Sequence, residues 1–380
     1  MHTPTLRRTG ATLATAALAV ALVGCGSDSG SEGADAGSES STATTTATST
    51  AAGEAAAGAA AAWFAGQLTD GVLVNEEYDA PDYGGTVDAI YSLEAVGGHD
   101  ADVDAMTEAV YAHAQEYAAP DQDVWAGNAG KLVALATDNG DDPSDLDGFD
   151  ALGTLLGRID ESGRTSDKSQ YGDFANSLGQ AWAVRGLAGA GAAEAAAATD
   201  FLLLQQCADG FFRQDFSKPK AKDQSCDGDG GTASVDATAL AVLLLGDVAA
   251  DDEDLATALE AAVAYLVGAQ ADDGSFEGGA DLPANANSTG LAARALAQAG
   301  EDEAAAAAAG WLRAHQVGDD CAGALADASG AIAYDDAAVT GATQDGITAA
   351  SSYQWRLATA QALPGLLTAP EDAAAACPAA

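Results

Sequence analysis

Asp236 is the residue of this sequence best suited to proton chemistry, and it lies in the segment SVDATA at positions 234–239. A carboxylic acid works as a strong catalytic proton donor where its neighbours stabilise both the proton and the conjugate base. Positions 234 and 237 hold serine and alanine, so the segment contains no second carboxylic acid that could assist Asp236. The alternative role is structural, because the helix dipole stabilises a carboxylate in the first turn of a helix. We expect the structural role and keep catalysis as the alternative.

A second set of candidates consists of aromatic, amide and acidic side chains that recur where alanine-rich helices are expected to begin. If those helix starts converge on one mouth, they would form a cup for a small molecule, a glycan or a peptide. Each residue taken singly is better explained as a helix cap or as packing, whereas for the set as a whole the two explanations are even. The predicted pocket residues are Tyr83, Asp88, Tyr171, Phe174, Asn176, Gln180, Asn287, Tyr353 and Trp355.

Residues 1–24 have the composition of a secretory signal peptide. Arg7 and Arg8 precede the apolar stretch ATLATAALAVALVG, which is too short to span a bilayer comfortably. The stretch ends in LVGC, which resembles the lipobox of bacterial lipoproteins. The resemblance implies cleavage before Cys25, acylation of Cys25, and a mature protein held on the cell membrane outside the cytoplasm. An ordinary secretory signal that contains a cysteine is the alternative.

The segment 25–59 is rich in Ser, Thr, Ala, Gly and acidic residues. It has too little apolar surface to offset the entropy of ordering, so we predict a lipidated, disordered linker. Residues 60–370 are long enough for one well-filled domain. Residues 371–380 are then a C-terminal tail.

Four cysteines follow Cys25, and an even number in an oxidising compartment predicts two disulfides. Three pairings are possible. We favour Cys207–Cys226, which closes a short loop, together with Cys321–Cys377, which ties the tail to the last repeat.

The composition also argues against several function classes. A formal net charge of −44 argues against nucleic acid as a partner, since no basic patch is present to neutralise phosphates. Zinc is the competing explanation of the cysteines, but the sequence has no Cys-x-x-Cys, and His99, His113 and His315 lack a ligand spacing to the cysteines. We therefore predict no metal and no other cofactor.

Six pairs of helical segments are expected across residues 60–370. The first segment of a pair carries a polar face, whereas the second is apolar nearly all round and rich in small residues. An amphipathic helix covers a surface and a uniformly apolar helix is buried. Each pair therefore predicts an outer helix followed by an inner helix, in an open solenoid or a closed ring. No alternating β-branched run predicts a sheet, so the fold class is all-α.

Two stretches of twelve residues share one pattern: FLLLQQCADGFF at 201–212 and YLVGAQADDGSF at 265–276. The pattern resembles the QW motif of squalene and hopene cyclases. That resemblance implies an α/α toroid, an α6/α6 barrel of six helical hairpins, in which glutamine satisfies helix-end backbone groups and glycine makes the turn. The matching residues are Phe201, Gln206, Gly210, Phe212, Tyr265, Gln270, Gly274 and Phe276; the last unit keeps Gln316 but lacks the Gly-x-Phe end.

The chain as a whole resembles bacterial lipoproteins with prenyltransferase/squalene-oxidase repeats. In the cyclases of this fold an Asp-x-Asp-Asp-Thr-Ala motif supplies the acid that protonates an alkene or epoxide, and Asp236 matches its middle aspartate. We expect a cell-surface lipoprotein whose toroid binds a ligand or a protein partner without catalysis. The alternative is a terpene cyclase-like or prenyltransferase-like enzyme that acts on an isoprenoid or lipid with Asp236 as general acid. A spacer or adhesion scaffold is a third possibility.

Overall fold

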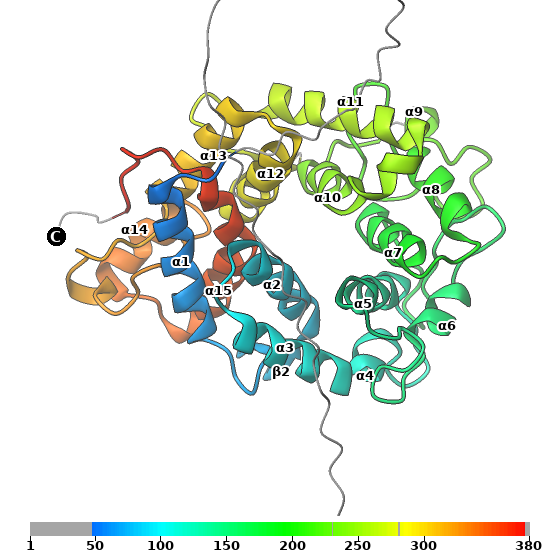
Figure 1. Cartoon of the computed structure of the whole chain (residues 1–380), viewed down its shortest axis with the longest axis horizontal. Helices are drawn as coiled ribbons and strands as arrows, with labels where there is room; N and C mark the ends of the chain where they lie inside the picture. The colour runs from blue at the N-terminus through cyan, green and yellow to red at the C-terminus, as the bar shows by residue number, and fades with distance from the viewer. Residues whose placement is uncertain (1–47, 230, 280–281, 377–380) are drawn as a thin grey trace, which may run out of the picture. The chain divides into compact units, whose positions relative to one another are not determined.

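Six inner helices stand side by side and close into a ring in the computed structural model, which describes residues 48–229, 231–279 and 282–376 (Figure 1). Each inner helix contacts the next one along the chain, and the last contacts the first. The inner helices are α2 (Tyr83–Val96), α5 (Ala126–Asn139), α7 (Ser177–Gly189), α10 (Val235–Leu245), α12 (Ala286–Ala299) and α15 (Ala349–Ala362). The predicted all-α toroid is confirmed.

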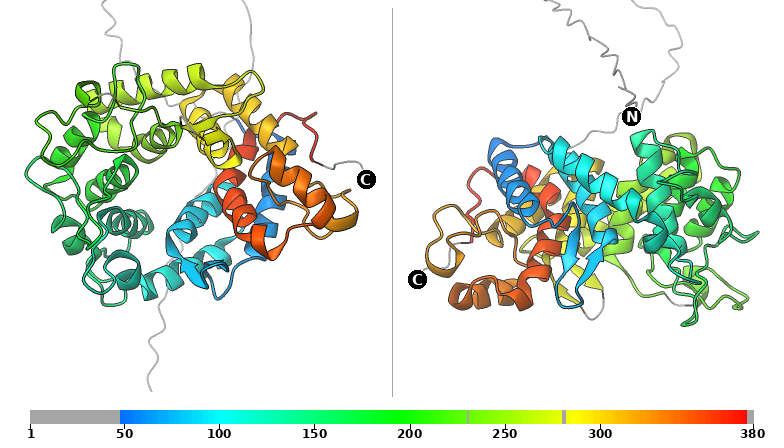
Figure 2. Two further views of the ribbon diagram at one scale, coloured as in Figure 1. Left: turned by 180° about the vertical axis from the view of Figure 1, so that it is seen from behind. Right: turned by 90° about the horizontal axis from the view of Figure 1, so that it is seen from below.

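Outer helices cover this ring, one before each inner helix in the chain (Figure 2). They are α1 (Ala51–Ala65), α3 (Asp100–Ala112), α6 (Ala151–Leu156), α8 (Ala195–Leu203), α11 (Glu253–Ala269) and α13 (Asp302–Ala314). The core lies between the two layers, where Phe64, Phe201, Phe212 and Phe276 are fully buried. None of the helices in the described part of the chain is both long and apolar enough to cross a bilayer.

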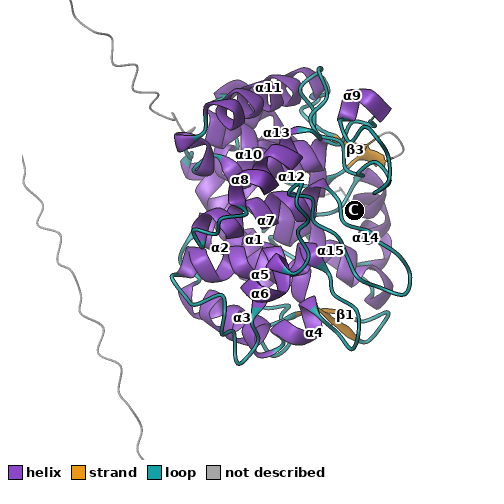
Figure 3. Cartoon of the chain, turned by 90° about the vertical axis from the view of Figure 1, so that its right-hand side faces the viewer, coloured by secondary structure: helices purple, strands orange, loops and turns teal. Residues whose placement is uncertain are grey.

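Shorter elements complete the loops. They are the helices α4 (Ala114–Ala118), α9 (Cys226–Asp229) and α14 (Asp336–Asp345), and the 3-10 turns η1 (Val248–Asp251), η2 (Gly323–Leu325) and η3 (Leu363–Thr368). Two antiparallel hairpins, β1 (Leu73–Asn75) with β2 (Ala80–Asp82) and β3 (Glu277–Gly279) with β4 (Leu282–Ala284), each precede an inner helix. Both hairpins lie on the side of the ring where inner helices begin, here called the mouth (Figure 3).

The repeated glutamine and glycine link neighbouring outer helices. Gln206 Nε2 donates to Gly210 O (2.8 Å) within its own turn and to Ala258 O (2.7 Å) in α11. Gln270 repeats both bonds, to Gly274 O (3.0 Å) and to a carbonyl of α13 (2.9 Å). Both glycines have positive φ, at 93° and 89°, which a residue with a Cβ rarely adopts.

The last unit closes the outer layer by the same device. Gln316 Nε2 donates to Gly330 O (3.2 Å) and to Ala56 O (2.8 Å) in α1. Ile332 then takes the place of the motif phenylalanine, because its N–H donates to Thr359 Oγ1 (2.9 Å) as Phe212 donates to Thr238. The Gly-x-Phe end that the sequence appeared to lack is therefore replaced by Gly330-x-Ile332, after an insertion.

The toroid begins before the predicted start at residue 60. Helix α1 starts at Ala51, where Thr50 Oγ1 accepts the N–H of Gly53 and donates to Ala369 O (2.6 Å). Ala56 and Ala57, which composition assigned to the linker, are buried, and α1 packs against η3. The side chains at the start of α1 are small, but their burial against the C-terminal end of the chain orders this segment. Residues 1–47, with the predicted signal peptide and Cys25, lie outside the described residues.

The predicted disulfide between Cys207 and Cys226 is present, and it joins the turn after α8 to the start of α9. Cys377 lies outside the described residues, so its pairing with Cys321 stays a prediction. The segment that leads to Cys377 does return to the last repeat, because Ala376 N–H donates to Gln316 O (2.8 Å).

Candidate functional site

A cavity of about 610 Å³ lies inside the ring, and side chains from all six inner helices line it. Its volume falls within the range of roughly 300–1,000 Å³ that is typical of pockets for small molecules. Residues of the mouth loops complete the lining, among them Trp125, Asp167, Leu282 and Tyr334. The cavity is the principal candidate for a functional site.

One wall of the cavity is polar. Lys131 Nζ of α5 forms an ion pair with Asp88 Oδ1 of α2 (2.6 Å). The chain of contacts continues from Asp88 to Gln361 of α15 (3.5 Å) and from Gln361 to the Nδ2 of Asn287 in α12. Burial acts to lower the pKa of Lys131, but the facing Asp88 carboxylate outweighs it and raises that pKa. The lysine is therefore charged at neutral pH.

The opposite wall is apolar. Leu240, Leu243 and Leu244 share one face of α10, because positions three and four apart lie on the same side of a helix. Trp182 of α7 and Leu291 of α12 flank them. Lys131 Nζ lies 5.2 Å from the centre of the Trp182 ring, where a cation–π contact joins the two walls. The cavity is therefore amphipathic.

Asp236 lies in the first turn of α10 and lines the cavity on its mouth side. Its Oδ1 is buried and accepts no hydrogen bond from any described residue. Burial raises the pKa of this carboxyl, and the Ser288 hydroxyl acts in the opposite direction. No second carboxylate within the described ranges bonds to it, so its conjugate base has little support.

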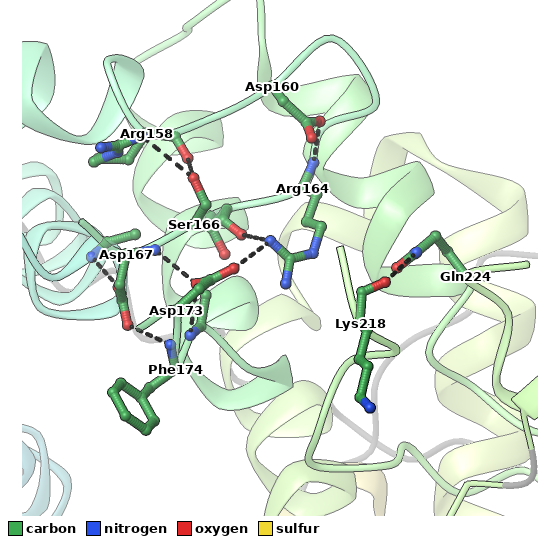
Figure 4. A network of polar contacts seen from close by, with 12 residues as sticks. Arg158, Asp160, Arg164, Ser166, Asp167, Asp173, Phe174, Lys218 and Gln224 are labelled. Carbon is green, nitrogen blue, oxygen red and sulfur yellow. Dashed lines mark hydrogen bonds and ion pairs between the residues drawn. The ribbon is translucent and has the colours of Figure 1, made fainter. Parts of the chain in front are cut away.

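Carboxylates of the loop before α7 hold the rim of the cavity (Figure 4). Asp167 accepts the N–H of Ala126 (2.8 Å) at the start of α5 and the N–H of Phe174 (3.3 Å). Asp173 in turn accepts from Asp167 N–H (2.8 Å) and from Arg164 (2.8 Å). Burial acts to raise the pKa of Asp173, but these donors lower it on balance. This network places Phe174 beside Trp125, with ring centres 6.4 Å apart.

Four of the predicted pocket residues, Asp88, Phe174, Asn176 and Asn287, line the cavity. Asn176 is also the N-cap of α7, where its side chain accepts Gly179 N–H (3.0 Å). Capping and cavity lining therefore coincide at this residue.

Three other predicted pocket residues lie away from the cavity. Gln180 is fully buried, and its amide donates to Gly163 O (2.8 Å) and to Ala198 O (3.0 Å) in α8. It therefore makes the same two kinds of bond as Gln206 and Gln270. Tyr83 packs on His113, and burial beside Glu116 raises its pKa to about 12. Tyr171 is 73% exposed on the loop.

Tyr353 and Trp355 also lie away from the cavity, because α15 starts earlier than the other inner helices. Thr359, which accepts a backbone N–H as Thr289 does in α12, is the eleventh residue of α15, whereas Thr289 is the fourth residue of α12. Tyr353 instead donates to Asp82 Oδ2 (2.7 Å), and Trp355 is buried in a separate small core. Gln361, two residues past Thr359, lines the cavity in their place.

Three cationic residues of the cavity were not among the predicted pocket residues: Lys131, Arg185 and Arg294. A signal for them was present, because each is a positive charge within an inner helix made mostly of small and apolar residues. A lysine or arginine in a buried helix is rare unless it is paired or functional. No cluster of three or more metal-ligating side chains occurs in the described part of the chain.

The closed ring of six inner and six outer helices defines this protein as an α/α toroid. No family model and no curated protein matches the sequence. Among solved structures it is similar to a protein from Actinoplanes, at 18% identity and a TM-score of 0.57 over 83% of this chain and 99% of that one. It is also similar to the type II terpene cyclase MstE from Scytonema, at 15% identity and a TM-score of 0.57 over 83% and 97%.

A third similar structure is an unsaturated glucuronyl hydrolase specific for heparin, at 13% identity and a TM-score of 0.56 over 83% of this chain and 96% of that one. Similarity at these identities establishes the fold. Function has to be argued from the cavity of this chain.

Proposed function

We propose that the toroid binds an amphipathic small molecule in its central cavity and does not transform it. One observation carries the proposal: a polar wall that runs from Lys131 through Asp88 to Asn287 faces an apolar wall of Trp182 and leucines across about 610 Å³. A few placed polar groups opposite an apolar surface bind and orient a ligand that has both kinds of surface. A volume of about 610 Å³ favours a small molecule over a glycan chain or a protein.

Binding without catalysis is supported by the surroundings of Asp236. A raised pKa makes a carboxylic acid a weaker proton donor, and protonation of an alkene needs a strong one. The single Ser288 hydroxyl is the only neighbour that lowers this pKa. Asp236 is better suited to hydrogen-bond a ligand.

We further propose that the mature chain works outside the cytoplasm, anchored to the bilayer through acylated Cys25. The support is the lipobox-like LVGC and the linker that follows it. A tether of this kind would hold the toroid near the membrane, where amphipathic molecules concentrate.

The experiment that tests binding is mass spectrometry of small molecules extracted from the purified full chain. Leu240→Trp adds bulk to the apolar wall and should remove the extracted species, because the indole occupies the cavity. Leu204→Trp is the matched control, since Leu204 is 45% exposed at the end of α8 and should leave the extract unchanged. An extract free of any small molecule, or identical extracts from both variants, would contradict the proposal.

A second candidate function is cyclisation or related chemistry on an isoprenoid, with Asp236 as general acid. Its support is the position of Asp236 in a cavity with an apolar wall, and the likeness in fold to MstE, a variant of which was solved with geranylgeranyl dihydroxybenzoate. Incubation of the chain with the extracted ligand separates the two functions. Conversion of the ligand that is lost in Asp236→Asn would establish the second function, whereas recovery of unchanged ligand supports the first.

A further inference from the structure

Arg294 is the cation of the cavity that the protein itself leaves without a partner. It lies on α12, lines the cavity and is partly buried. Its guanidinium forms neither a hydrogen bond nor an ion pair with any residue in the described ranges. An arginine has five N–H donors in a fixed planar fork, so this leaves an unusual number of donors facing the cavity.

The other two cations of the cavity are paired. Arg185 Nε donates to Asp138 Oδ2 (2.7 Å), and its Nη1 donates to Leu244 O (2.8 Å). Lys131 is held by Asp88 at 2.6 Å. Each of these two cations therefore has a carboxylate partner of its own, whereas Arg294 has none among the described residues.

The surroundings of Arg294 are unfavourable to its charge. Burial lowers the pKa of Arg294, and the nearby positive charge of Arg185 lowers it further. Glu94, Tyr91 and Asp88 act in the opposite direction, but none of the three forms an ion pair or a hydrogen bond with the guanidinium. Two cations close together beside an apolar wall are stabilised by an anion placed between them.

The spacing of the cavity residues along α12 shows which groups a ligand with its anion at Arg294 would meet. Asn287, Leu291 and Arg294 follow one another on one face of the helix and all line the cavity. Arg294 lies seven positions after Asn287, which corresponds to about 10 Å of helix. The cavity is thus polar at Asn287 and Asp236, apolar at Leu291 and the α10 leucines, and cationic at Arg294.

We propose that Arg294 binds an oxyanion, so that the ligand is an apolar molecule with a carboxylate or phosphate at one end. The inference rests on the proposed function and specifies its ligand class. A guanidinium binds either group through two parallel hydrogen bonds, which gives orientation as well as affinity. The apolar body then lies along the leucine wall, and its far end reaches the acceptors at Asp236 and Asn287.

Titration calorimetry of the full chain with decanoate, decyl phosphate and 1-decanol tests this. We expect at least one anion to bind about tenfold or more tightly than decanol, since a charged hydrogen bond contributes more than a neutral one. Tighter binding of decyl phosphate would assign a phosphorylated ligand, and tighter binding of decanoate a carboxylic acid. Equal affinity for all three probes would overturn the oxyanion site and leave the proposed function standing, whereas failure of all three to bind would overturn both.

Substitution of Arg294 distinguishes anion binding at this side chain from general electrostatic attraction of anions to the protein. Arg294→Gln should lower the affinity for the anions to about that for decanol, and Arg294→Lys should retain part of the anion preference, because the charge remains without the fork. Arg313→Gln, on the outer helix α13 and away from the cavity, should change neither. Circular dichroism checks the fold, and the lysine variant carries the test if the glutamine variant does not fold. An undiminished anion preference in the folded Arg294 variants would overturn the proposal.

Discussion

Asp236 and Asn287 occupy equivalent positions on the neighbouring helices α10 and α12. Each lies two residues before a threonine whose hydroxyl accepts the N–H of a buried phenylalanine, at 3.0 Å in both units. Each also has a buried Oδ1 that accepts no hydrogen bond from the described residues. The repeat therefore places two acceptors side by side at the cavity, where a ligand hydroxyl or amine would satisfy them.

We expect Asp236→Asn to stabilise the protein at neutral pH. Because burial raises the pKa of Asp236, the unfolded chain loses this proton at lower pH than the folded chain does. The free energy of unfolding therefore falls as pH rises from the ordinary pKa of 3.8 through the raised one. The variant lacks this loss, so it should be more stable than the wild-type chain at pH 7.

Urea unfolding of both proteins at pH 7 and pH 4 measures this difference, which should shrink at the lower pH. Asp254→Asn is the control, since Asp254 is an exposed acid in the first turn of α11. Loss of the Asp254 charge should lower the free energy of unfolding by less than about 1 kcal/mol, because the helix dipole stabilises an acid in the first turn. A destabilised Asp236→Asn, or a difference that does not depend on pH, would contradict the prediction.

Gln316→Ala should strongly destabilise the ring, because Gln316 joins the last unit to the first. The side chain is 1% exposed, and its loss leaves the carbonyls of Gly330 and Ala56 without these bonds. We expect the free energy of unfolding to fall by about 2–4 kcal/mol. Gln67→Ala removes a single long bond to Trp63 O (3.4 Å) and should cost less than about 1 kcal/mol. Equal costs for the two variants would argue against closure through Gln316.

The fold was predictable because its signals are local and repeated. The Gln-x3-Gly spacing predicts one turn and one pair of hydrogen bonds wherever it occurs, and the uniform apolar character of the inner helices predicts burial. The closing turn was harder to recognise, because an insertion separates Gln316 from Gly330. Its pairing with Ala56 depends on a contact across 260 positions of the chain, which no local pattern encodes.

The cavity was less predictable, because its lining depends on how each inner helix is rotated and shifted. Helices of nearly uniform hydrophobicity do not show which face meets the centre, so Trp182 and the α10 leucines had no distinguishing signal. The shift of α15 likewise replaces Tyr353 with Gln361. Asp88, Asn176 and Asn287 were found because helix starts are visible in sequence through their caps and first turns.

Two glycines of one unit should respond in opposite ways to alanine. Gly274 has φ of 89°, and a Cβ there would lie 2.3 Å from Ala307 O, so Gly274→Ala should cost about 3 kcal/mol or more. Gly268, inside α11, has open space around an added Cβ, and Gly268→Ala should stabilise by about 0.5–1 kcal/mol. Thermal unfolding of the two variants compares them. A tolerated alanine at Gly274 would show that the turn does not need its left-handed backbone.

The Cys207–Cys226 bond should contribute to the stability of the toroid. It closes a loop with a sequence separation of 19, which corresponds to about 3 kcal/mol if the bond acts on the unfolded chain. We expect Cys207→Ala/Cys226→Ala to lower the free energy of unfolding by that amount. A free-thiol assay on the unfolded wild-type chain, before and after reduction, checks that the bond forms. Free Cys207 and Cys226 thiols before reduction would contradict the prediction.

The Lys131–Asp88 pair should be strongly coupled, because the two side chains are only 13% and 26% exposed. Lys131→Met leaves a partly buried carboxylate without its cation and should cost about 3 kcal/mol, and Asp88→Asn should be comparable. The double variant removes both charges and should cost less than the sum, with a coupling of about 2 kcal/mol by urea unfolding. The exposed pair His113–Glu116 is the control, and its coupling should stay below about 0.5 kcal/mol. Coupling for Lys131–Asp88 as small as that would mean that solvent in the cavity screens the pair, and that the polar wall is not held in place by charge.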